Sequence, residues 1–253
     1  MYQVIKLPSQ RRHTHAYLHC VQRHNQIYLQ TEIEASALLD YRKQNPSMGC
    51  LACVIYAISQ VLKHYPRANS YYRRVWGGKI VEYPHVYAKF TLDKYLSNER
   101  IVLSGMVPQA DTMTIAHIQQ CITAAKNADP ADPEYGRGPK LLHQLPLPLG
   151  KRLMAAVLRQ PEKALMRQGT FAISSLGKSD ICGFFPITTT TLGFGVAKIQ
   201  AKVIARGKTM VAVPHLPVTM CFDHRVIDGA IAADILDQIK STLQHLALGE
   251  PHV

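Results

Sequence analysis

The segment from residue 221 to residue 229 constrains this chain most, because it reads Cys-Phe-Asp-His-Arg-Val-Ile-Asp-Gly. The apolar run 216–220 ahead of it predicts a strand, and residues 230–246 behind it repeat Ile and Leu at helical spacing. Enzymes often hold a general base at such a junction, because an unperturbed imidazole exchanges its proton near neutral pH. The pattern therefore predicts that His224 carries chemistry.

The bulk composition is that of an ordinary globular protein. The chain has 253 residues, 47% of them apolar and 18% charged, enough for one large domain or two small ones. No apolar run reaches the roughly 18 residues that span a membrane, and residues 1–6 do not begin a signal peptide. The six cysteines are scattered, which favours reduced thiols. We expect a cytoplasmic protein without a membrane segment.

The formal charge of +12 predicts an acidic partner. Three candidates are nucleic acid, a phosphorylated cofactor such as coenzyme A, and an acidic carrier protein. The basic residues are spread along the chain and no nucleic-acid-binding motif accompanies them. We therefore expect no nucleic-acid partner; a nucleic-acid binder would show salt-sensitive binding.

Helical and strand-like patterns alternate irregularly along the chain, which predicts an α+β fold. We expect strands at 26–34, 79–83, 86–92, 100–107, 169–174, 192–199, 209–213 and 216–222, and helices within 1–25 and at 36–41, 48–64, 112–125, 153–166 and 230–246. Residues 129–150 contain five prolines, so we interpret them as a connector or insertion.

Several segments together resemble one family. Beside the motif at 223–229, several further segments are similar to the catalytic domain of dihydrolipoamide acyltransferases. They are residues 169–177 (Gly-Thr-Phe-Ala-Ile-Ser-Ser-Leu-Gly), 186–187 with 192–196, 32–34 with 37–43, and 56–66 with Asn69 and Tyr71. These proteins are the core components of 2-oxoacid dehydrogenase complexes. The resemblance implies a chloramphenicol acetyltransferase-like fold, a two-layer mixed sheet packed with helices, in which residues 1–253 form a single catalytic domain.

The chain also departs from the family pattern. The catalytic part begins almost at Met1, where the family usually has lipoyl and subunit-binding modules first. Residues 90–108 lack the Gly-Leu-Val-Val-Pro pattern of complex-forming members, and 129–150 resembles an insertion. We expect a stand-alone domain, with membership of a dehydrogenase complex and the acyl acceptor left open.

Acyl transfer to a thiol requires a base and an oxyanion donor. A free thiol with a pKa near 8.5 is mostly protonated at neutral pH, so a base such as neutral His224 must take its proton. A strand places Ala172 and Ser174 on one face and Ser175 on the other, so only one of the two serines points into a site. The resemblance favours Ser174 as the oxyanion donor. The structural alternatives are a turn-bound histidine and a serine that satisfies the backbone at a strand end.

The resemblance implies supporting roles around this histidine. Asp228 would fix its loop by pairing with an arginine, and Arg11 or Arg12 is the partner that their positions favour. The other supporting residues are Asp223, Arg225 and Gly229, the last because glycine allows a tight turn ahead of a helix.

Three weaker patterns favour structural interpretations. Gly193-Phe194-Gly195 indicates a close approach of strands rather than a phosphate loop. Cys50 and Cys53 begin an amphipathic helix without a second pair, so core thiols are favoured over zinc. The third pattern is a group of histidines near the N-terminus, namely His13, His15 and His19, which we interpret as surface residues. We expect no metal.

The leading hypothesis is an acyltransferase that moves an acyl group between coenzyme A and a thiol, either dihydrolipoyl or carrier-bound. The resemblance implies a homotrimer with active sites between subunits, His224 coming from one chain and Ser174 from its neighbour. A lipoyl group would then be supplied in trans, by an acidic lipoyl or acyl carrier domain. The alternatives are a biosynthetic acyltransferase with an amine or hydroxyl acceptor, and a non-catalytic trimeric scaffold.

Overall fold

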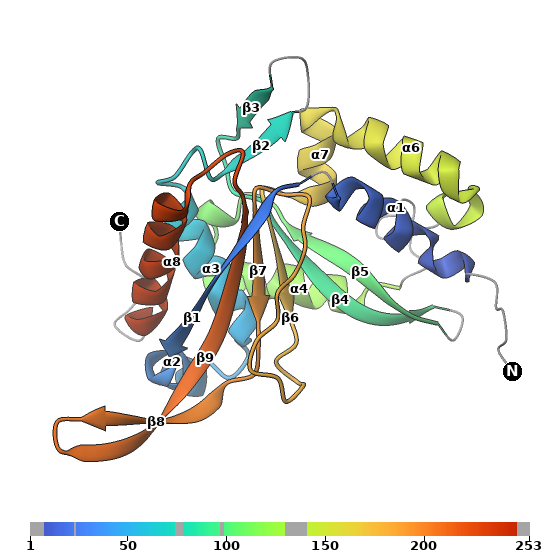
Figure 1. The fold of residues 1–253 in the computed structure, drawn as a ribbon. Helices are drawn as coiled ribbons and strands as arrows, with labels where there is room; N and C mark the ends of the chain where they lie inside the picture. The colour runs from blue at the N-terminus through green and yellow to red at the C-terminus, as the bar shows by residue number, and fades with distance from the viewer. Residues whose placement is uncertain (1–7, 23, 74–77, 97–98, 130–140, 247–253) are drawn as a thin grey trace, which may run out of the picture.

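A mixed sheet forms the centre of the molecule (Figure 1). The computed structural model describes residues 8–22, 24–73, 78–96, 99–129 and 141–246. Within them the seven-stranded sheet has the order β1-β9-β7-β6-β4-β5, with β8 paired to β9. Its strands are β1 (Gln26–Glu34), β4 (Ala88–Leu96), β5 (Glu99–Val107), β6 (Phe171–Ser175), β7 (Leu192–Val196), β8 (Gln200–Arg206) and β9 (Thr209–Asp223). β6 runs parallel to β4 and β7, and the other neighbouring pairs are antiparallel.

Helices lie on both sides of the sheet. One group is α2 (Ser36–Gln44), α3 (Cys50–Leu62), α4 (Ile115–Asn127) and α8 (Gly229–Gln244). The other is α1 (Arg12–Val21), α6 (Leu147–Leu158) and α7 (Pro161–Gln168). α1 and α6 lie side by side, and α7 leads from α6 to β6 (Figure 1). A separate hairpin pairs β2 (Ser70–Arg73) with β3 (Lys79–Glu82). Two 3₁₀ turns complete the elements, Ser9–Arg11 and Ala110–Thr112.

One face of the sheet packs against the hydrophobic core, and this packing determines which side chains lie on the other face. Phe90, Phe171, Phe194 and Phe222 are fully buried in one cluster, and the rings of Phe171 and Phe194 meet edge to face at 5.7 Å. Side chains alternate along a strand, so burying these residues turns their immediate neighbours to the other face. That face therefore carries Ser174 of β6.

The α+β expectation is confirmed, with local differences. The two strands expected at 209–213 and 216–222 form one strand, β9, which continues through Pro214 and Pro217. β8 was not expected; it forms a hairpin with β9 around Gly207, whose φ is +62°. The prediction that 129–150 is wholly a connector is wrong at its end. α6 begins at Leu147, since a proline in the first turn costs no helical hydrogen bond. Residues 130–140 lie outside the described part.

Close strand approach explains the glycines of β7, as expected. A Cβ on Gly193 would lie 2.7 Å from the Sγ of Cys221, and one on Gly195 would lie 1.9 Å from the carbonyl oxygen of Phe184. None of the helices that the structure describes is both long and apolar enough to cross a bilayer.

We expect Gly195→Ala to lower the free energy of unfolding by about 2 kcal/mol or more, because the backbone carbonyl of Phe184 must move to admit a methyl group. Gly229→Ala is the matched control. No heavy atom lies within 4 Å of a Cβ at that position, so its change should stay within about 0.5 kcal/mol. Urea unfolding of both variants checks this, and equal effects would contradict it.

Candidate functional site

His224 lies immediately after β9 on a short turn. Its backbone N–H donates to the carbonyl of Asn25 at 2.9 Å, which extends the pairing of β9 with β1 by one residue. The Nδ1 atom lies 3.5 Å from Oδ1 of Asp228, and 43% of the His224 side chain is exposed. The ring therefore has a carboxylate beside one nitrogen and is partly open to solvent.

A buried ion pair anchors this turn. Asp223 is 2% exposed, and Arg225 Nε donates to its Oδ1 at 2.8 Å while Nη2 pairs with the other carboxylate oxygen. The Arg225 backbone N–H adds a bond of 3.1 Å to the same Oδ1. The guanidinium also lies over the ring of Tyr72, 4.2 Å from its centroid. The residues on both sides of His224 are thus held in place, as supporting roles for Asp223 and Arg225 require.

The other predicted supports behave differently. Asp228 is 82% exposed and lies beside His224. Arg12 is occupied elsewhere, because its Nη1 donates to the carbonyls of His143 and Leu145 at 3.0 and 3.1 Å. Arg11 is exposed at the end of the first 3₁₀ turn. An arginine partner for Asp228 therefore stays a prediction, since no arginine among the described residues forms an ion pair with it.

Gly229 does not have the conformation that we expected. It is the first residue of α8, its φ lies outside the left-handed region, and a Cβ there would have open space around it. The turn into α8 therefore has a backbone that other residues can adopt, and the expectation of a glycine-dependent turn is wrong.

Ser174 lies on the face of the sheet opposite the core. It is half-buried, and Thr91 Oγ1 on the adjacent strand β4 donates to its Oγ at 3.0 Å. Ser175 is exposed, and its Oγ accepts from the backbone of Gly177 at 3.5 Å. The two serines thus differ in their surroundings, as strand alternation predicts.

Ser174 and His224 do not meet within one chain. Ser174 pairs with Gly195 of β7, and Gly195 pairs with Thr219 of β9, five residues before His224. Five strand residues and two strand spacings correspond to roughly 17 Å along the sheet and 10 Å across it. A side-chain hydroxyl cannot bridge that separation, so one chain alone does not assemble both groups.

Lys89 is a polar residue on the Ser174 face that the sequence did not distinguish. It pairs with Ala172, its Nζ donates to Gln168 at 2.8 Å, and it lies 5.3 Å from the ring centroid of Tyr17 in α1. No described carboxylate forms an ion pair with it. Burial lowers the pKa of Lys89 to about 8. Its burial depends on α1 and α7, so no local pattern could have predicted it.

The cysteines of the Cys-X-X-Cys pair pack as core thiols. Cys53 is fully buried in α3 and Cys50 packs against the same cluster. Burial raises the pKa of Cys50 to about 11 and that of Cys53 to about 12, which disfavours the thiolates that bind zinc. His13 is half-buried and held 2.8 Å from a ring nitrogen of His143, so the expectation of a surface histidine is wrong there. Among the described residues no group of three or more potential ligands gathers.

We expect Arg225→Met to lower the free energy of unfolding by about 3 kcal/mol, because it leaves the buried carboxylate of Asp223 unpaired. Arg100→Met is the control. It removes an ion pair with Asp93 whose side chains are 69% and 53% exposed, so it should cost less than about 1 kcal/mol. Urea titration of each variant measures the difference, and equal losses would be the contrary result.

A pH-dependent test concerns Lys89. The native protein releases this proton near pH 8, whereas the unfolded chain holds it to about 10.5, so wild-type stability rises with pH in that window. We expect Lys89→Met to raise the free energy of unfolding by about 1–3 kcal/mol below pH 8, and the gain to fade as the pH approaches 10.5. Urea unfolding across this range, with the exposed Lys79→Met as control, checks it; a gain independent of pH would refute it.

Known proteins provide an independent comparison. Residues 154–248 match the family model for the 2-oxoacid dehydrogenases acyltransferase (catalytic domain). The dihydrolipoyllysine-residue acetyltransferase component of the pyruvate dehydrogenase complex from Staphylococcus aureus is 27% identical over 231 residues, which are 87% of this chain and 46% of that protein. The chain thus spans about half the length of the curated relatives it matches.

Two solved structures show the fold. The dihydrolipoamide acetyltransferase of Azotobacter vinelandii aligns with a TM-score of 0.72 at 19% identity, covering 98% of this chain and 95% of that one. Chloramphenicol acetyltransferase aligns with a TM-score of 0.52 at 14% identity, covering 96% and 100%. In sequence and in fold, the chain resembles the catalytic domain of the dihydrolipoamide acyltransferases, with the mixed sheet and helices of chloramphenicol acetyltransferase.

Proposed function

We propose that this chain is an acyltransferase that moves an acyl group between coenzyme A and a thiol acceptor, dihydrolipoyl or carrier-bound. The observation that carries the proposal is His224, which lies beside Asp228 and is half-exposed at a strand-to-helix junction inside the segment that matches the family model. Residues 1–253 would act as a single catalytic domain in the cytoplasm.

His224 is the general base in this proposal. With Nδ1 beside the carboxylate of Asp228, Nε2 is the nitrogen that faces the acceptor thiol. Nε2 takes the thiol proton as the sulfur attacks the thioester carbonyl, and Asp228 stabilises the imidazolium that forms. When the tetrahedral intermediate collapses, the carbon–sulfur bond to coenzyme A breaks and His224 returns the proton to the departing thiolate.

Ser174 is the oxyanion donor. Because Thr91 donates to its Oγ, the Ser174 hydroxyl hydrogen is free to point at the developing oxyanion. The A. vinelandii enzyme was studied for the roles of a serine, a histidine and an asparagine in its catalytic mechanism. That histidine and asparagine are four residues apart, as His224 and Asp228 are here.

Assembly into a homotrimer would bring the two groups together, with His224 from one subunit and Ser174 from the next. The separation of the two residues within one chain supports this arrangement. The segment that follows β6 also exposes apolar side chains, namely Leu176, Phe185 and Ile187, which are 41%, 51% and 45% exposed. A neighbouring subunit that covers them would remove this apolar surface from water.

The acceptor would reach the site on another protein. A lipoyl group would be supplied in trans on an acidic lipoyl or acyl carrier domain. The formal charge of +12 on this chain would attract that acidic domain. We propose no metal, because thiol and thioester chemistry at this site needs only a base and an oxyanion donor.

Mixed trimers test the shared site. We expect His224→Ala and Ser174→Ala each to lose on the order of a hundredfold or more in acyl transfer from acyl-coenzyme A. Co-assembled in equal amounts, they should regain about a quarter of the wild-type rate, since random mixing completes that share of the interfaces. Ser175→Ala is the control and should keep full activity. Full activity in His224→Ala would overturn the function, and mixed trimers without recovery would overturn the shared site.

A further inference from the structure

Lys89 and Ser174 lie on the same face of the sheet. Their strand neighbours Phe90 and Ile173 are buried in the core, so alternation turns both polar side chains to the other face. Lys89 pairs with Ala172, two residues before Ser174, which places the Cα atoms of Lys89 and Ser174 about 8 Å apart. Between them β6 presents the methyl group of Ala172. A short acyl chain whose carbonyl oxygen is bound at Ser174 can therefore extend along the sheet to Lys89.

Neutral groups hold the ammonium group of Lys89. Its Nζ donates to Oε1 of Gln168 at 2.8 Å and lies 5.3 Å from the ring centroid of Tyr17. The same oxygen of Gln168 accepts a second bond, of 2.9 Å, from the hydroxyl of Thr189. Because an ammonium group has three hydrogens, this arrangement leaves Nζ with donor capacity for a ligand.

No carboxylate of the described residues forms an ion pair with Lys89. Asp93, the acidic residue on the same face of β4, pairs with Arg100 at 2.6 Å. His13, which lies close enough to respond to the charge of Lys89, is itself basic. Burial lowers the pKa of His13, and the charges of Arg11 and Lys89 add to that lowering. A half-buried ammonium without a counter-ion is unfavourable, so an anionic ligand gains more here than a neutral one.

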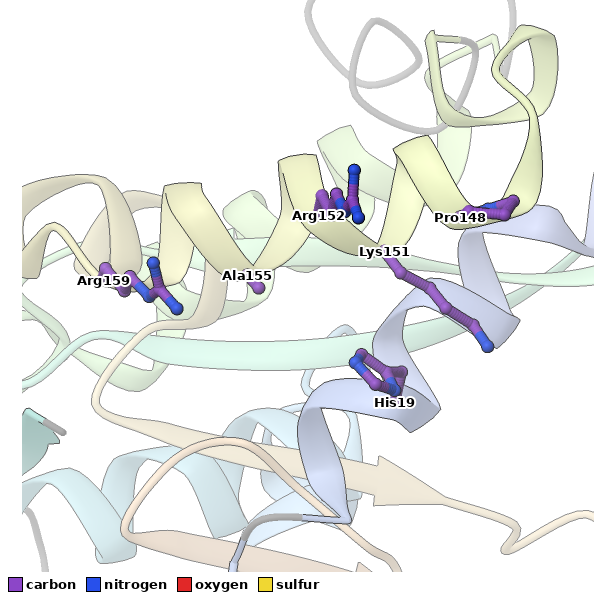
Figure 2. Close-up of a pocket in the computed structure, with 6 residues that line it drawn as sticks. All are labelled: His19, Pro148, Lys151, Arg152, Ala155 and Arg159. Atoms are coloured by element: carbon purple, nitrogen blue, oxygen red, sulfur yellow. The ribbon is translucent and has the colours of Figure 1, made fainter.

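A second group of cations lies away from this face. Figure 2 shows Lys151, Arg152 and Arg159 on α6 beside a cavity of about 490 Å³. The residues that line this cavity belong to α1 and α6, and none of them comes from the sheet. Lys89 is therefore the cation that the sheet itself places beside Ser174 without a carboxylate.

We propose that Lys89 binds a carboxylate at the far end of the acyl group, so that the enzyme selects acyl donors derived from dicarboxylic acids. The proposal rests on the acyl-transfer function above and names the class of acyl group. The acyl carbonyl lies at Ser174, the chain crosses Ala172, and the terminal carboxylate accepts a charge-assisted hydrogen bond from Nζ. A neutral acyl chain leaves that ammonium without a counter-ion.

The test uses pairs of acyl-coenzyme A donors that differ at the far end of the chain. Succinyl- and butyryl-coenzyme A have equal numbers of acyl carbons but end in a carboxylate and a methyl group, and glutaryl- and valeryl-coenzyme A form a longer pair. We expect the wild-type kcat/KM to be about tenfold or more higher for the carboxylate member of at least one pair. Lys89→Met should lower that ratio by about tenfold or more, because the contact with Nζ is lost.

Two features make this variant informative. Lys89→Met is expected to raise the free energy of unfolding, so a lost preference does not reflect an unfolded protein. Lys94→Met is the matched control, because Lys94 lies on the same strand but on the opposite face, where its Nζ donates to the carbonyl of Ala128. It should keep the wild-type ratio. No preference in either pair, a ratio that survives in Lys89→Met, or an equal loss in Lys94→Met overturns the proposal.

Calorimetric binding of the same donors without an acceptor separates this inference from the proposed function, because it needs no turnover. Wild type should bind the carboxylate member of the preferred pair more tightly than the methyl member, and Lys89→Met should lose that difference. If the protein transfers no acyl group but this difference persists, the function fails and the carboxylate site stands. If the enzyme is active but binds and uses both members equally, the carboxylate site fails and the function stands.

Discussion

The pairing of β9 with three other strands is the constraint on which the rest of the structure depends. The first half of this fifteen-residue strand pairs with β8, and the second half lies between β1 and β7 and pairs with both. Because β9 ends in the sheet at Asp223, the position of His224 follows from the register of the whole sheet. The buried pair of Asp223 and Arg225 then holds the turn itself. The candidate base is thus placed by long-range pairing and oriented by local contacts.

The same sheet explains why the two proposed catalytic residues lie apart in one chain. The core phenylalanines determine the face of β6, which leaves Ser174 on the opposite side and near the other end of the paired strands. No rotation of side chains brings it to His224 across roughly 20 Å of sheet. A second subunit would be the direct way to combine the proposed base and the proposed oxyanion donor, which the fold holds apart within one chain.

Local periodicity was sufficient to predict the main elements and the face of Ser174. The alternation in 169–174 and the helical spacing in 230–246 depend only on neighbours in sequence. Both patterns can therefore be recognised without knowing the tertiary structure. β8 could not be predicted in this way, because most of its side chains are exposed and it is held by pairing with β9. The burial of Lys89 and the stacking of Arg225 on Tyr72 join segments far apart in the chain. Only the beginning of α6, residues 147–152, was missed, because the prolines there favoured a connector.

The central proposal is that His224 of one subunit and Ser174 of the next form one site. A crystal or electron cryomicroscopy structure of the protein with coenzyme A tests it most directly. The account predicts a trimer in which His224 Nε2 faces the Ser174 hydroxyl across the interface, with the coenzyme A thiol between them. A monomer, or a trimer in which these side chains face different surfaces, would contradict it.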